Sequence, residues 1–96
     1  MYDRGITTVQ IFGKEYPISS DQNPEYIQKL ADYVDKKMNE IASETETLAS
    51  GRIAILACLN IADDLMRLKK EKEQLIRIIE ERIANITKMI EKKLSE

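Results

Sequence analysis

The chain has 96 residues, of which 33% are charged and 5% aromatic, so it is long enough for one small domain with an extension and too short for a two-domain enzyme. This composition is typical of long helices and coiled coils. The net charge of −2 is unevenly distributed. Residues 1–66 are acidic, with six basic and eleven acidic side chains, and residues 67–96 are mildly basic, with nine basic and six acidic side chains. This distribution argues against a dedicated nucleic-acid-binding protein.

The first residues of the chain, 1–5, form a polar leader that lacks the charged and then apolar layout of a signal peptide. The densest apolar run, residues 53–62, has about half of the roughly 20 residues that a membrane-spanning helix needs. We therefore expect a cytoplasmic protein that does not span a membrane.

Residues 7–12 and 15–19 are predicted to form a β-hairpin around Gly13-Lys14. A glycine at the first central position suits a tight two-residue turn. Because side chains alternate along a strand, this turn places four apolar residues on one face. The expected pairs are Val9 with Ile18 and Ile11 with Tyr16. A lone hairpin is marginal in water, so this face needs a cover.

A helix over residues 24–43 is predicted to provide that cover. Asn23-Pro24 is a helix-start signal, since asparagine can cap free amides and proline suits the first helical position. Apolar residues then recur at helical spacing. They are Ile27, Leu30, Ala31, Val34, Met38, Ile41 and Ala42. This stripe should pack on the apolar face of the hairpin.

Residues 44–51 lose the helical period and are expected to connect the first helix to a long second one, with Ser50 as a candidate cap. Residues 53–59 are apolar nearly all round, which predicts burial on every side, within a globular head or between two heads. Cys58 is accordingly expected to be a small buried hydrophobe rather than a reactive thiol. Asn60, among apolar neighbours, is expected to fix the register of packing.

One unbroken helical pattern without proline or glycine runs over residues 52–95. Its 44 positions would span about 66 Å at roughly 1.5 Å per residue, which is too long for so small a chain to cover. The apolar stripe is therefore predicted to meet other copies of the chain. The expected oligomer interface consists of Leu65, Leu68, Leu75, Ile79, Ile83, Ile86, Ile90 and Leu94.

Two features of this stripe predict its assembly. Several of its residues lie eleven apart, a spacing of about 3.67 residues per turn that suits a straight or slightly right-handed bundle. Isoleucine along the seam favours more than two helices, so we expect a tetramer, built from two dimers, rather than a plain dimer. Lys72 occupies a seam position and should locally weaken the contact.

Residue types that usually act in catalysis or bind metals and cofactors are scarce in this chain. The chain has no histidine, one cysteine and no glycine-rich phosphate loop, so we expect no catalytic, cofactor-binding or metal site and no enzymatic activity. Asp63-Asp64 point about 100° apart on a helix and should be solvated or lie at the rim of an interface. The basic residues within 67–72 alternate with glutamates, which indicates a solvated helix face with internal ion pairs.

These predictions combine into an α+β fold. Residues 1–50 would form a globular head of hairpin (about 7–19) and helix (about 24–43). Residues 51–96 would form a long C-terminal coiled-coil helix, whose start packs in the head and whose remainder is the oligomerising coiled coil.

Three stretches, residues 9–16, 30–38 and 55–65, closely resemble the ZapA family of bacterial cell-division proteins. The resemblance covers about residues 8–68 and is followed by a coiled-coil tail in the expected place. The hairpin sequence Ile-Phe-Gly-Lys and the Ala-x-Leu-Asn-Ile-Ala-x-x-Leu run are specific only in combination. Within the second, Cys58 occupies the x after the first alanine, where alanine is more usual in the family.

The resemblance implies a non-enzymatic protein that binds FtsZ, the tubulin-like division GTPase, in the cytoplasm at the mid-cell division site. Family members crosslink FtsZ protofilaments and stabilise the Z-ring. They dimerise and commonly pair into tetramers through the long helix, with heads at both ends. Lys14 occupies the family's basic turn position, which makes it a candidate contact with FtsZ; the alternative is an ordinary exposed turn lysine.

Two other functions fit the architecture. A generic coiled-coil adaptor or prefoldin-like holdase would capture clients on exposed apolar surface of the head. A nucleoid- or RNA-associated protein would use the basic residues within 67–72, although the acidic head disfavours it and it would show a steep dependence on salt.

Overall fold

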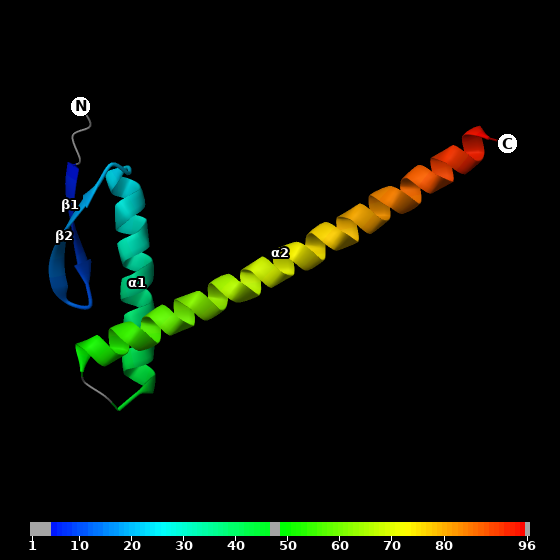
Figure 1. Ribbon diagram of the computed structural model, residues 1–96. Helices are drawn as coiled ribbons and strands as arrows, with labels where there is room; N and C mark the ends of the chain where they lie inside the picture. The colour runs from blue at the N-terminus through cyan, green and yellow to red at the C-terminus, as the bar shows by residue number, and fades with distance from the viewer. Residues whose placement is uncertain (1–4, 47–48, 96) are drawn as a thin grey trace. The chain divides into compact units, whose positions relative to one another are not determined.

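The structure, a computed structural model, describes residues 5–46 and 49–95. Strands β1 (Gly5–Ile11) and β2 (Lys14–Ser20) are followed by helices α1 (Pro24–Glu44) and α2 (Ser50–Leu94) (Figure 1). The predicted α+β fold is confirmed. The chain divides into two compact units, Met1–Ile61 and Ala62–Glu96. Residues 1–4 of the polar leader and 47–48 of the connector lie outside the described residues.

The hairpin turn differs from the prediction by one position. Its central residues are Phe12 and Gly13, both with positive φ, 53° and 79°, and not Gly13-Lys14. Val9 therefore pairs with Tyr16, and Ile11 pairs with Lys14. Two positive φ values in succession are typical of the type I′ turn, whose twist matches the flanking strands.

The predicted apolar face survives this change, because the pairing is displaced by two residues and side chains alternate with a period of two. Val9 is buried against Ile27 and Ala31 of α1, and Ile11 and Ile18 pack against the same cluster. Figure 1 shows α1 running alongside the hairpin. The predicted cover is thus confirmed.

Helix α1 begins as its sequence predicts. The Asn23 side chain accepts a hydrogen bond from the Glu25 amide at 2.8 Å, and Pro24 is the first helical residue. The buried residues of α1 are Ile27, Ala31 and Met38. Leu30 is 46% exposed in spite of its place in the apolar stripe; it lines an open hollow together with Val9 and Ile18 of the hairpin.

The first turns of α2 are buried on one side only. Ile53 and Ala57 form a buried cluster with Met38 of α1, whereas Ile55 and Leu59 are 63% and 64% exposed. The expectation of burial on every side is therefore wrong for the single chain. Cys58, expected to be buried, is exposed, because it lies outside the sector of α2 that faces α1.

Two further expectations at the start of α2 are also wrong. Ser50 is the first residue of the helix and not its cap, and the carbonyl of Ala49 accepts the bond from Ile53. Asn60 is exposed and not buried. Its Oδ1 accepts a hydrogen bond of 2.9 Å from Lys37 Nζ, so this amide joins α2 to α1 within the unit Met1–Ile61.

Candidate interaction surfaces

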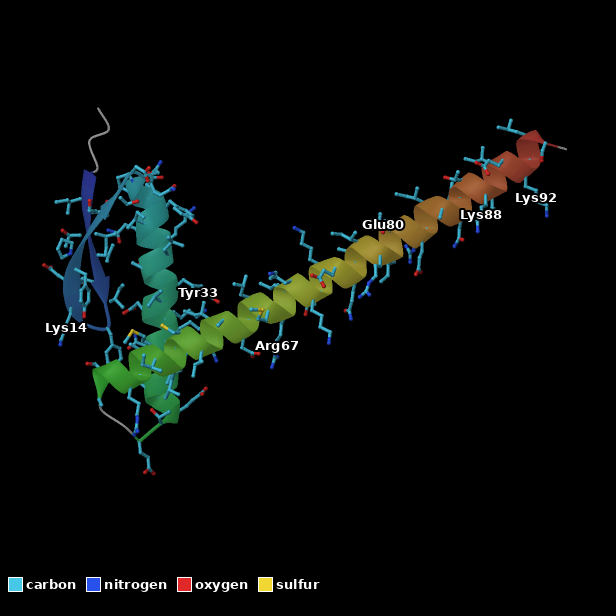
Figure 2. The ribbon with its side chains drawn as sticks, viewed as in Figure 1. Lys14, Tyr33, Arg67, Glu80, Lys88 and Lys92 are labelled. Carbon is cyan, nitrogen blue, oxygen red and sulfur yellow. The ribbon has the colours of Figure 1, made fainter. Side chains whose placement is uncertain are left out.

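Lys14, the candidate partner contact, lies at the turn end of the hairpin. It is the first residue of β2, opposite Ile11, and directly follows the turn. Its side chain is exposed (Figure 2). Lys14 is therefore next to the turn rather than within it, and it remains accessible to a partner.

The turn itself is fixed to the helices. The Phe12 N–H donates a hydrogen bond of 2.8 Å to Asp35 Oδ1 on α1. The Phe12 side chain packs against the buried cluster of Met38, Ile53 and Ala57. The contact of Asp35 with the turn was not predicted, since an aspartate on the flank of a helix is ordinarily solvated. The sequence signal for it is the bulky Phe12 directly before the turn glycine.

A hollow opens beside the turn. Its floor is apolar, and among the described residues that line it only Lys14 is charged. The lining residues are Ile11, Phe12, Lys14, Tyr16, Ile18, Met38, Ser50, Gly51 and Ala54.

The unit Ala62–Glu96 carries the second surface. Each of the eight predicted interface residues lies on α2 and is between 46% and 82% exposed. They recur three, four or seven positions apart and so follow one stripe of the helix. Within residues 62–95 nothing in the same unit covers this stripe. Figure 2 shows side chains projecting from this part of the helix, including the labelled Arg67 and Glu80.

The charged residues at the start of this unit are solvated. Asp63 pairs with Arg67, four residues later, at 3.1 Å, and both side chains are mostly exposed. Lys69, Lys70 and Lys72 are exposed as well. Such a pair contributes little to stability, so these residues form a solvated helix face.

The described part of the chain has neither a metal-ligand cluster nor a helix that could span a membrane. Residues 5–46 and 49–95 contain no group of three or more histidine, cysteine, aspartate or glutamate side chains placed to hold a metal ion. No helix in those ranges is long and apolar enough to cross a membrane.

Comparisons with known proteins agree on one family. The family model described as cell division protein ZapA matches residues 7–91. Cell division protein ZapA of Shouchella clausii is 38% identical over 66 residues, which are 69% of this chain and 85% of that protein. Its counterpart in Halalkalibacterium halodurans is 36% identical over 75 residues, 78% of each chain.

Two solved structures are similar in fold. An unknown conserved bacterial protein from Pseudomonas aeruginosa PAO1 matches with a TM-score of 0.75 and 33% identity, over 91% of this chain and 97% of that one. A ZapA mutant dimer from Geobacillus stearothermophilus matches with a TM-score of 0.61 and 28% identity, over 81% and 91% of the two chains.

Proposed function

Because this chain belongs to the ZapA family of cell division proteins, we propose that it binds FtsZ at the mid-cell division site in the cytoplasm and crosslinks FtsZ protofilaments. It acts without catalysis, as an oligomer with several filament-binding heads, and so stabilises the Z-ring. The observation that carries this proposal is the uncovered apolar stripe on α2.

The stripe supports association by its size. Fully burying a leucine or isoleucine side chain is worth about 1.5–3 kcal/mol, and the interface contains eight of them, each at least 46% exposed in the single chain. Even partial burial of all eight contributes on the order of 10 kcal/mol per chain, which is comparable to the cost of association. Other copies of the chain carry the same apolar stripe, so we expect them to bury it.

The residue types in the stripe indicate how many helices the oligomer contains. Isoleucine at four of the eight positions favours more than two helices, and the similar Geobacillus stearothermophilus structure is described as a dimer. Ile76 and Ile78, also exposed, widen the apolar surface beyond what one neighbouring helix covers. We therefore propose that dimers pair into tetramers through α2.

The charges along one flank of the stripe favour neighbouring helices that run in opposite directions. Asp64, Glu71, Ile78, Arg82 and Lys93 lie seven, four or eleven positions apart and so share one side of α2. Before Ile78 this flank carries Asp64 and Glu71 together with Arg67, and after Ile78 it carries Arg82 and Lys93, so its net charge changes from negative to positive. Two copies that cross at Ile78 in opposite directions bring the acidic half of each beside the basic half of the other. Opposed copies would carry heads at both ends.

Crosslinking then needs only weak binding by each head. Once one head is bound, the remaining heads meet filament subunits at high effective concentration, so weak contacts combine into avidity. Lys14, exposed beside the hairpin turn, is the proposed contact of each head with an acidic surface of FtsZ.

The test of crosslinking is low-speed sedimentation of assembled FtsZ with the Ile83→Glu variant. A charge in the seam should separate the helices, so that the head stays folded and the bundles disappear. Ala84→Glu is the matched control, since Ala84 is exposed and lies on the side of α2 away from both the stripe and its charged flank. Bundling by Ile83→Glu at the wild-type level would contradict the proposal.

The test of the contact is the Lys14→Glu variant. It should weaken co-sedimentation with FtsZ polymers and leave the oligomer size unchanged. Lys29→Glu makes the same charge change at an exposed position of α1 and should bind as wild type does. Equal binding by all three proteins would remove Lys14 from the binding surface.

A further inference from the structure

The least common backbone conformation among the described residues belongs to Phe12. Its φ of 53° lies in the left-handed region, and it is the only residue other than glycine there in the described part of the chain. Bulky side chains rarely adopt this conformation. Asparagine or aspartate usually occupies this position of a type I′ turn, so the chain holds a strained residue where a relaxed one was available.

Two contacts hold Phe12 in this conformation. Asp35 Oδ1 accepts its N–H at 2.8 Å. In a two-residue hairpin the strand ladder does not use the N–H of the first turn residue, and this one is partly buried, so it needs another acceptor. A carboxylate makes that hydrogen bond stronger than a neutral acceptor would. The Phe12 ring is held separately, against Met38, Ile53 and Ala57.

From this geometry we infer that Asp35 is a positioning residue for the partner-binding turn. It fixes the backbone at Phe12 and so presents Lys14, two residues later, to the filament in one orientation. A turn that is already ordered loses less conformational entropy on binding. The inference rests on the proposed function, because the partner that Lys14 meets is the FtsZ polymer.

The experiment measures co-sedimentation of full-length variants with assembled FtsZ. Asp35→Ala should weaken binding about tenfold, as expected for loss of a charge-assisted hydrogen bond. Asp35→Asn keeps a side-chain oxygen as acceptor and should stay within about threefold of wild type. The double variant Asp35→Ala with Lys14→Glu should bind no more weakly than Lys14→Glu alone, because both act through one contact.

Two controls separate positioning from stability and from charge. Ile27→Val removes one methylene from the other buried cluster, which Ile27 forms with Val9 and Ala31; it should lower the melting temperature and leave FtsZ binding unchanged. Asp32→Ala removes a carboxylate from an exposed position of α1 and should bind as wild type does. Amide hydrogen exchange at Phe12 should accelerate in Asp35→Ala and not in either control.

Three results would overturn the inference while wild type pellets normally. These are unchanged binding by Asp35→Ala, additive losses in the double variant, and a loss in Ile27→Val as large as that in Asp35→Ala. Failure of wild type itself to pellet with FtsZ is a different result, which overturns the proposed function.

Discussion

At the scale of single residues, the two positions of the hairpin turn tolerate a left-handed backbone in different ways. Gly13 has a φ of 79° and no neighbouring atom within 4 Å of an added Cβ, so only its conformation restricts what can replace it. Phe12 adopts a φ of 53° because Asp35 and the apolar cluster hold it there. The conformation of Gly13 therefore depends on local preference, and that of Phe12 depends on tertiary contacts.

The first prediction concerns Gly13→Ala. Alanine at this positive φ should destabilise the fold by about 1 kcal/mol or more, measured as the free energy of unfolding in denaturant. Gly51→Ala is the matched control, because Gly51 is helical, also has open space around it and lacks a positive φ. There alanine should be neutral or stabilising by up to about 1 kcal/mol. Equal losses in both variants would contradict the turn geometry.

The second prediction compares two isoleucines of α2. Ile53 is 1% exposed and Ile55 is 63% exposed. Ile53→Ala should lower the free energy of unfolding by about 2–5 kcal/mol because it leaves a cavity. Ile55→Ala should cost well under 1 kcal/mol at low protein concentration. A comparable loss at Ile55 would show that its side of the helix is covered in solution.

At the scale of the elements, local patterns predicted the hairpin, α1 with its Asn23 cap, and the long helix. They also predicted the apolar face of the hairpin, because a register error of two residues preserves the alternation of side chains. The predicted position of the turn was wrong, because a glycine suits either the first or the second central position of a two-residue turn. The observed position, Phe12-Gly13, is the one in which Asp35, 23 residues away, accepts the Phe12 N–H.

Burial at the start of α2 could not be predicted from composition. An apolar run of residues shows that contacts exist without showing which molecule supplies them. Ile53 and Ala57 find theirs on α1, while Ile55, Cys58 and Leu59 are exposed in the single chain. The contribution of Asn60 was also missed, because its partner Lys37 belongs to another helix.

The third prediction tests the flank charges of α2. Glu71→Arg and Arg82→Glu should each shift oligomer dissociation to higher protein concentration, and the double swap should restore it, because the two charges meet between opposed copies. Each pair is worth about 0.5–1 kcal/mol, and high salt should reduce the difference. Glu81→Arg, away from the stripe, is the control. Failure of the double swap to recover would contradict opposed helices crossing at Ile78.

At the scale of the whole molecule, the two surfaces have separate tasks in the proposed function. The unit Met1–Ile61 contains Lys14 and the hairpin turn that Asp35 holds. The unit Ala62–Glu96 contains the apolar stripe. In that proposal the unit Met1–Ile61 binds a filament, and the unit Ala62–Glu96 sets how many copies of the Lys14 surface act together. Crosslinking requires both, since a single weak site cannot bridge two filaments.

The central claim is that other copies of the chain cover the stripe on α2. The most direct measurement is the molar mass of the purified protein by light scattering across a dilution series. We expect a molar mass two or four times the chain mass of 11.1 kDa, which should fall as the protein is diluted. A folded protein that keeps the mass of one chain at high concentration would contradict it.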